Sequence, residues 1–245
     1  MTFDRTRAGG LSRRSLLGLG AGAVALAGCT AAPRVRLPSA LGPAPTAPAP
    51  AVSPLPQGGV TPNYFQPITS EPFTIPPVPQ GVVPQQYWRQ IVPNPTGEPE
   101  GTIVIDPGQK YLYWNIAGGR SIRYGVGVGR QGFGWSGRAI IALKRAWPNW
   151  TPPDEMIARQ PELAKFSAEN GGQPPGLTNP LGARALYLFQ NGEDTLYRIH
   201  GNPEAASIGR NVSSGCIRLL NHDIIDLYER VPTGTPVLVR NSGVV

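Results

Sequence analysis

Residues 101–129 read GTIVIDPGQKYLYWNIAGGRSIRYGVGVG, and this stretch decides the fold. Short apolar runs at 102–105 and 110–115 flank the turn sequence DPGQ at 106–109, which is the pattern of a β-hairpin. A further apolar run at 120–128 follows two glycines. The stretch therefore predicts three short strands joined by turns.

The remainder of the chain continues this pattern as far as about residue 240. Further strands are expected at 137–143, 185–189, 195–200 and 237–240, and short helices at 154–159 and 223–230. Asn221 stands where a side-chain cap of the second helix would be. Many short strands with one or two short helices predict a mainly β domain over residues 101–240, a sandwich or partly open barrel.

The residues before this domain divide into two segments of different composition. Residues 30–62 are rich in Ala and Pro, and proline fixes φ and removes a backbone donor, so this segment is expected to be an extended tether. Residues 63–100 mix prolines with aromatic side chains. We expect them to form an arm that packs on the domain, with 86–92 as its most ordered part.

Residues 1–29 have the pattern of an export signal. The sequence SRRSLL at 12–17 resembles a twin-arginine motif, and the apolar run at 16–27 is too short to span a bilayer. The run ends in LAGC at 26–29, which resembles a bacterial lipobox. The expectation is a lipid on Cys29, a membrane anchor through that lipid, and a periplasmic or cell-envelope location. A plain signal peptide with an incidental Cys29 is the alternative.

Charge and cysteine content limit the possible partners. The formal net charge is +7, and part of it lies in the first 28 residues. The other Lys and Arg residues are scattered, so nucleic acid is not an expected partner. The chain has two cysteines, Cys29 and Cys216. They could form a disulfide, but lipidation of Cys29 would leave Cys216 as the sole thiol.

The densest group of chemically informative residues lies between His200 and Arg218. Cys216 follows Gly215 directly, and His200 ends an expected strand. An unperturbed thiol has a pKa of about 8.5 and needs a neighbouring base to act as a nucleophile at neutral pH. The backbone N–H groups at Gly215 and Cys216 could stabilise a tetrahedral oxyanion. The group predicts a Cys–His nucleophilic site.

Other uses of these residues have less support. A metal site would have to combine His200, His222 and Cys216, and no pair has zinc-type spacing, so neither a metal nor another cofactor is expected. No C-x-x-C is present for redox chemistry. An inert buried thiol remains open as an alternative for Cys216.

Two further features are ambiguous. Residues 127–132 match the dinucleotide fingerprint G-x-G-x-x-G, but an apolar strand at 139–143 follows where that fold needs a helix, so a glycine-rich turn is expected. Trp147 and Trp150 could line a glycan-facing surface or form a small satellite core.

The motifs together resemble the L,D-transpeptidase catalytic domain of the YkuD type. The resemblance extends from about residue 101 to 240. It rests on HG at 200–201 and SSGCIR at 213–218, with YGVGVG at 124–129, WSG at 135–137 and NPLG at 179–182.

The resemblance implies a role for each residue of the site. Cys216 would be the nucleophile and His200 the general base, with the Gly201 carbonyl orienting the imidazole and Gly215 contributing a backbone oxyanion donor. Substrate-binding roles would fall to three further positions, Arg218, Ser213 and Ser214. Several family members have His or Arg at the position of Ser214, so the role of this side chain is open.

The reaction implied is acyl transfer on peptidoglycan stem tetrapeptides. A thioester would form on the cysteine with release of D-alanine, and an acceptor amine would then take the acyl group. With water as acceptor the enzyme would be an L,D-carboxypeptidase or endopeptidase. A non-catalytic peptidoglycan-binding module is the third possibility, and the sequence does not identify the acceptor.

Overall fold

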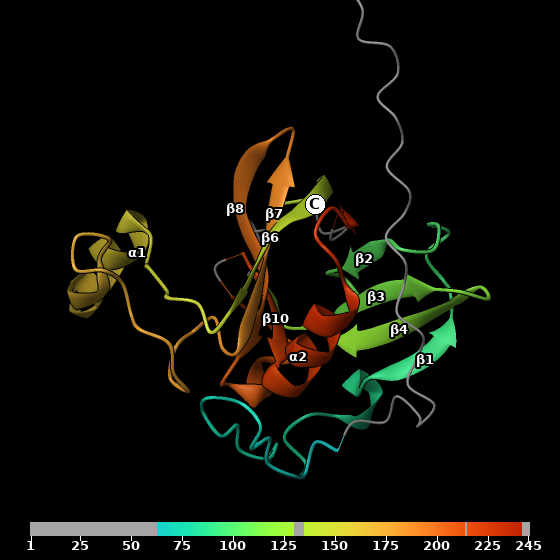
Figure 1. Ribbon diagram of the computed structural model, residues 1–245, viewed down its shortest axis with the longest axis horizontal. Helices are drawn as coiled ribbons and strands as arrows, with labels where there is room; N and C mark the ends of the chain where they lie inside the picture. The colour runs from blue at the N-terminus through green and yellow to red at the C-terminus, as the bar shows by residue number, and fades with distance from the viewer. Residues whose placement is uncertain (1–62, 130–134, 214, 242–245) are drawn as a thin grey trace, which may run out of the picture. The chain divides into compact units, whose positions relative to one another are not determined.

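The computed structural model describes residues 63–129, 135–213 and 215–241 (Figure 1). All of them lie in one compact unit, Ala47–Val245. A sheet of nine strands forms its framework, in the order β1-β4-β3-β2-β11-β6-β7-β8-β10. The strands are β1 Gln90–Pro93, β2 Ile103–Asp106, β3 Tyr111–Ile116, β4 Arg120–Gly125, β6 Gly137–Ala146, β7 Arg184–Gln190, β8 Glu193–Asn202, β10 Ile217–Leu220 and β11 Pro236–Val239.

The sheet starts from the hairpin that the sequence predicts. β2 and β3 pair antiparallel around the DPGQ turn, where Asp106 Oδ1 accepts a hydrogen bond of 2.9 Å from Gln109 N. Most neighbours in the sheet are antiparallel, but β11 pairs parallel with β2, and β10 pairs parallel with β8. A separate parallel pair joins β5 (Val128–Gly129) to β9 (Asn211–Ser213).

The twisted sheet encloses a single main core. Side chains from both halves of the strand order, such as Trp114 on β3 and Leu186 on β7, belong to the same buried cluster. The helix α2 (Asn221–Arg230) packs on β7, β8 and β10 and adds Ile224 and Leu227 to this cluster (Figure 1). The prediction of a mainly β domain is confirmed.

The sheet folds over without closing into a continuous barrel. In the described part of the chain, an isolated bridge between Gly127 and Arg218 links β10 back to the segment after β4. Its two hydrogen bonds are 2.9 Å, from Gly127 N to Arg218 O, and 2.8 Å in the reverse direction. The single strand expected over 120–128 is therefore interrupted, because β4 ends at Gly125 and β5 pairs elsewhere.

The helices are short, and one predicted detail is wrong. α1 spans Asp154–Arg159 as expected, whereas α2 begins at Asn221 after Leu220, without a side-chain cap. The Asn221 Oδ1 atom instead accepts a hydrogen bond of 2.9 Å from Ala183 N, so it is not available to cap the helix. Short 3-10 turns occur at η1 Gln85–Tyr87, η2 Pro161–Phe166 and η3 Ala205–Ser207. Among the described helices, none combines the length and apolar character needed to cross a membrane.

The arm before the domain is joined to it by the sheet and by close packing. β1 adds to the edge of the sheet beside β4, from Gln90 opposite Arg123 to Pro93 opposite Arg120. The Tyr87 side chain packs against Gly209, where a Cβ atom would lie 2.4 Å from its ring. Packing of the arm thus depends on the absence of a side chain at this glycine.

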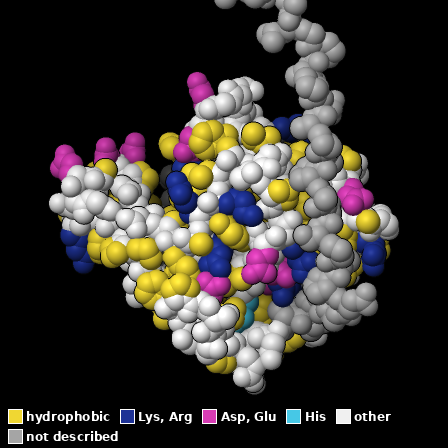
Figure 2. All heavy atoms as spheres, viewed as in Figure 1, with side chains coloured by type: hydrophobic (Ala, Val, Ile, Leu, Met, Phe, Trp, Pro, Cys, Tyr) yellow, Lys and Arg dark blue, Asp and Glu magenta, His cyan; other side chains and the backbone are white. Residues whose placement is uncertain are grey.

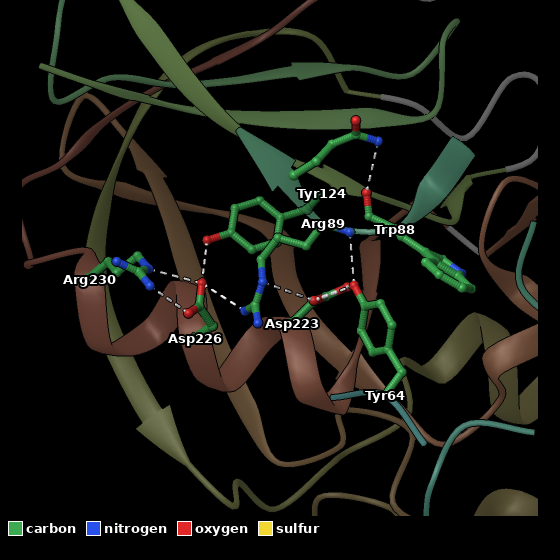
Figure 3. A network of polar contacts seen from close by, with 8 residues as sticks. Tyr64, Trp88, Arg89, Tyr124, Asp223, Asp226 and Arg230 are labelled. Carbon is green, nitrogen blue, oxygen red and sulfur yellow. Dashed lines mark hydrogen bonds and ion pairs between the residues drawn. The ribbon is translucent and has the colours of Figure 1, made fainter. Parts of the chain in front are cut away.

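A network of buried polar groups connects the arm to α2 (Figure 3). The Tyr64 hydroxyl donates to both carboxylate oxygens of Asp223, at 2.9 and 3.0 Å. Arg89 forms a 2.8 Å ion pair with Asp226, which also accepts a hydrogen bond of 2.7 Å from the Tyr124 hydroxyl. The arm is therefore held near its start by Tyr64 and directly before β1 by Arg89.

Candidate active site

The parallel pairing of β8 with β10 determines the geometry of the site. Ile217 lies opposite Ile199, and Arg218 lies opposite His200. Ile199 and Ile217 point into the main core. Since side chains alternate between the two faces of a strand, His200 and Arg218 lie on the other face. Cys216 directly precedes β10, two positions from Arg218.

Continued by one residue before Ile217, this register sets Cys216 opposite Arg198, two positions from His200 on β8. Strands are about 4.8 Å apart and rise about 3.3 Å per residue, so a diagonal offset of two residues separates Cα atoms by about 8 Å. Two side chains that start from the same face can meet across that distance. The 16-residue separation between His200 and Cys216 in the sequence is thus reduced to one diagonal across neighbouring strands.

A backbone carbonyl favours one tautomer of the His200 ring. The residue is 4% exposed, and its Nδ1 atom lies 2.6 Å from the Gly201 carbonyl oxygen. A carbonyl oxygen only accepts, so Nδ1 carries the proton in this bond. In the neutral ring the lone pair is then on Nε2. This is the form that a general base requires.

Burial keeps the imidazole neutral. Desolvation is the main cause that lowers the pKa of His200 from 6.5 to about 4, and the positive charges of Arg218 and Arg198 lower it further. The Gly201 carbonyl opposes this shift, because it accepts a hydrogen bond from the ring. At neutral pH the ring is therefore a base that has not yet taken a proton.

Gly201 is enclosed by neighbouring segments that leave no room for a side chain. A Cβ atom on Gly201 would lie 2.3 Å from Asn221 Oδ1 and 2.9 Å from Ile224 Cγ2. Gly182, with φ of +60°, approaches the same place, and a Cβ atom there would lie 2.7 Å from the Gly201 carbonyl carbon. The NPLG sequence at 179–182 and the start of α2 together fix the carbonyl that holds the His200 ring.

Cys216 lies at the start of β10 behind a glycine with unusual backbone geometry. Gly215 has φ of +131°, a region that favours glycine, and Cys216 itself is partly exposed. Protein atoms around the sulfur raise the pKa of the thiol through burial, against the effect of a backbone hydrogen bond with Arg198 and the charges of Arg198 and Arg218. Both the thiol of Cys216 and the imidazole of His200 are therefore neutral at neutral pH.

Arg198 is a site residue that sequence reasoning missed. It precedes His200 by two positions on β8, so it lies on the same face of the sheet and interacts with Cys216. Its guanidinium forms two 2.7 Å hydrogen bonds with Asp194 and stacks over Tyr187, 4.3 Å from the ring centroid. The alternation of β8 could have indicated it, because residues 198 and 200 share one face of a strand.

The predicted substrate-binding residues are Arg218, Ser213 and Ser214, and the structure describes the first two of them. Arg218 lies beside His200, and its Nη1 atom is 3.5 Å from a carboxylate oxygen of Glu204, an exposed pair. Ser213 belongs to β9, opposite Gly129. Ser214 lies outside the described residues. Their roles in binding substrate stay predictions.

The structure bears on two ambiguous features of the sequence, the G-x-G-x-x-G match at 127–132 and Trp147. The glycines at 127 and 129 lead into β6, a ten-residue strand, which is not the helix that a dinucleotide fold places there. Trp147 packs against Phe73 of the arm with ring centroids 4.8 Å apart, which favours a small satellite cluster. Within the described ranges, no three His, Cys, Asp or Glu side chains gather to form a possible metal site.

Comparison with known proteins identifies the family of the domain. Residues 100–239 match the family model of the YkuD L,D-transpeptidase catalytic domain, which is more than half of the chain. The chain belongs to the YkuD family.

Relatives within the YkuD family are moderately similar. The probable L,D-transpeptidase YbiS of Escherichia coli K12 is 36% identical over 140 residues, 55% of this chain and 43% of that protein. A putative L,D-transpeptidase of Fuscovulum blasticum is 35% identical over 133 residues, 52% of this chain and 62% of its own length. The chain thus covers less than two thirds of either relative.

One solved structure is more similar in sequence. It is described as a probable carnitine operon oxidoreductase from Brucella melitensis, and it shares 44% identity over 62% of this chain and 93% of that one, with a TM-score of 0.45. The family model and both curated relatives are described as L,D-transpeptidases, and the oxidoreductase description applies to the Brucella melitensis protein.

Proposed function

We propose that the protein is a peptidoglycan L,D-transpeptidase that works through a thioester on Cys216. The observation that carries the proposal is the β8–β10 register: continued by one residue before Ile217, it would set Cys216 opposite Arg198, two positions from His200. The bond from His200 Nδ1 to the Gly201 carbonyl supports it, because it directs the lone pair of the neutral ring to Nε2. Membership in the YkuD family supplies the class of reaction.

The first half-reaction acylates the enzyme. The Cys216 sulfur attacks the carbonyl carbon of the amide between an L-centre and D-alanine in a stem tetrapeptide. His200 Nε2 takes the thiol proton as the carbon–sulfur bond forms. Backbone N–H groups at Gly215 and Cys216 would stabilise the oxyanion. The amide C–N bond then breaks, and D-alanine leaves with the proton from His200.

The second half-reaction transfers the acyl group. An acceptor amine attacks the thioester carbonyl, His200 takes its proton, and the carbon–sulfur bond breaks to restore the thiol. Arg218 and Arg198 place positive charge beside the sulfur and would attract the carboxylates of a stem peptide. Ser213 and Ser214 precede the nucleophile and would border the bound peptide.

Product analysis tests the proposed reaction. Purified protein incubated with disaccharide tetrapeptides should yield cross-linked dimers together with D-alanine. D-alanine or shortened peptides without dimers would identify a carboxypeptidase or endopeptidase, and no conversion would indicate a binding module. The same assay with Cys216→Ala should yield neither product.

We also propose that the enzyme acts outside the cytoplasmic membrane, held by a lipid on Cys29. The SRRSLL and LAGC sequences support export by the twin-arginine route and lipidation. In this arrangement the Ala/Pro-rich segment 30–62 is the tether and residues 101–240 are the catalytic domain. Cys29→Ser should release the protein from membranes in a fractionation experiment. Persistent membrane association of that variant would exclude the lipid anchor.

A further inference from the structure

A long excursion leaves the sheet next to the site. β6 ends at Ala146 and β7 begins at Arg184, so residues 147–183 lie outside the sheet, with α1 and η2 at the far end (Figure 1). The two ends of the excursion meet at a neck, where Trp147 N donates a hydrogen bond of 2.8 Å to Ala183 O. Trp147 has φ of +45°, an unfavourable value for a tryptophan.

A carboxylate from the arm holds this neck. Glu71 accepts a hydrogen bond of 2.7 Å from Trp147 Nε1 on one side of the neck. On the other side it accepts bonds of 2.9 and 2.5 Å from the two Nη atoms of Arg184. Both partners in the ion pair are largely buried, with side chains 11% exposed. One side chain of the arm thus binds both ends of the excursion.

The neck is in direct contact with the segment that holds the imidazole. Arg184 Nη1 donates to Ala183 O at 2.9 Å, and Ala183 N donates to Asn221 Oδ1 at 2.9 Å. That same Oδ1 atom lies against Gly201, with Gly182 packed beside it. The Gly201 carbonyl accepts the bond from the His200 ring. Five consecutive contacts therefore lead from Glu71 through Arg184, Ala183, Asn221 and Gly201 to the proposed base.

We propose that Glu71 is a positioning residue for the catalytic centre: by clamping Trp147 to Arg184 it fixes the 182–183 segment against Gly201 and so holds the His200 ring. This inference rests on the proposed function of His200 as general base. The hydrogen bonds from Arg184 lower the pKa of the Glu71 carboxyl, so the clamp stays ionised at neutral pH. The arm is then a component of the active enzyme, since it supplies the Glu71 carboxylate.

The test is Glu71→Gln in the full-length protein. Glutamine keeps the shape of the side chain but removes the charge and turns one acceptor into a donor facing a guanidinium. Acylation of Cys216 by a carbapenem, followed by intact mass, should show a maximal rate constant about tenfold lower, because small displacements of a reacting group cost rate steeply. The carbapenem concentration at half-maximal rate should change less than twofold.

Glu98→Gln is the matched control. Glu98 also belongs to the arm and also forms a two-bond ion pair with a domain arginine, Arg138, at 2.7 and 3.1 Å. That pair lies on β6, away from the neck, and the Arg138 side chain is 66% exposed. This variant removes a similar arm-to-domain contact and should acylate at the wild-type rate.

A second readout does not depend on activity. The chain has two histidines, so the 15N signals of the imidazoles can be assigned with His222→Gln. Wild-type His200 should show the Nδ1–H tautomer, and Glu71→Gln should broaden its signals or mix the tautomers, whereas Glu98→Gln should leave them unchanged. In Glu71→Gln, the pH below which the acylation rate constant falls should also differ from that of the wild type, because this fall reports protonation of His200.

The outcomes separate this inference from the proposed function. Wild-type acylation rates and unchanged His200 signals in Glu71→Gln would overturn the positioning role even if the enzyme is an L,D-transpeptidase. A loss of thermal stability alone, with unchanged signals and unchanged rate per folded molecule, would also overturn it. If the wild-type protein is not acylated at Cys216, the proposed function fails, and the His200 signals still decide whether Glu71 positions the ring.

Discussion

Two buried polar regions of this molecule use burial in opposite ways. At the β8–β10 edge, burial lowers the pKa of His200 to about 4 and raises that of Cys216, so both groups are neutral at pH 7. Between the arm and α2, burial opposes the ionisation of Asp226, yet bonds from Arg230, Arg89 and Tyr124 lower its pKa (Figure 3). In the first region the charges of Arg198 and Arg218 disfavour an imidazolium and do not overcome the effect of burial on the thiol, whereas in the second region the positive charges outweigh burial at Asp226.

The difference distinguishes residues proposed to react from residues that attach the arm to the domain. The charges near His200 are arginines, which repel an imidazolium, so the ring stays available to take a proton. In the arm network, Asp226 accepts two bonds from Arg230, at 2.8 and 2.9 Å, so its charge is fixed in place. Charges elsewhere are mixed, and Figure 2 shows basic side chains interspersed with acidic ones over the visible face. The proposed reacting groups are therefore kept neutral, whereas the anchoring carboxylate of Asp226 is kept ionised.

The largest effect is expected from removing the base. His200→Ala should reduce the rate of Cys216 acylation about a thousandfold, since general-base catalysis contributes about 10²–10⁴-fold. The fold should survive, because the ring projects from the face opposite the main core. Intact-mass kinetics with a carbapenem measure the rate. His222→Ala is the control, because His222 Nε2 faces Gln66 O of the arm at 3.3 Å, and its rate should remain near wild type.

The arm network should show the opposite response. Asp226→Ala leaves Arg89 and Arg230 without their shared carboxylate, and breaking a buried ion pair in this way costs about 3–5 kcal/mol. Urea unfolding measures that loss. The acylation rate per folded molecule should stay within about twofold of wild type. Glu98→Ala, which removes the exposed pair with Arg138, should cost much less stability.

Gly201→Ala tests the support of the site without removing a polar group. The added Cβ atom would lie 2.3 Å from Asn221 Oδ1, so the Gly201 carbonyl and the His200 ring must move. Acylation should slow about tenfold or more. Gly192→Ala is the comparison, because Gly192 has φ of +85° but nothing within 4 Å of a Cβ atom. It should cost about 1 kcal/mol of stability and leave the rate unchanged. Equal rates in the two variants would contradict the role of Gly201.

The last expected effect is on the pH dependence of stability. Burial raises the pKa of Asp223 to about 7, above its unfolded value of 3.8. A folded pKa above the unfolded one means that the folded state binds the proton more tightly, so stability falls as pH rises from about 4 through 7. Burial lowers the pKa of His200 to about 4, so the unfolded state binds this proton more tightly than the folded state. This group therefore makes stability fall as pH falls from 6.5 through 4. Asp223→Asn should remove the first dependence in urea titrations and leave the second.

The sequence predicts most of the fold and the core of the site, for identifiable reasons. The β2–β3 hairpin and α1 follow from local patterns of apolar residues and turn residues. β10 was not predicted, because four residues after a Gly-Cys pair carry no periodicity, and its parallel partner lies elsewhere in the chain. The cap predicted for Asn221 was wrong because its side chain bonds to Ala183, 38 positions away. Such long-range contacts leave no local signal, and the same is true of the Glu71 clamp.

The most direct test of the account is whether Cys216 is the group that becomes acylated. The wild-type protein treated with a carbapenem should gain one adduct by intact mass, and peptide mapping should place it on Cys216. Cys216→Ala should gain none, while Cys29→Ser should be acylated like the wild type. An equal adduct on Cys216→Ala, or no adduct on any form, would contradict the assignment of the nucleophile and with it the proposed reaction.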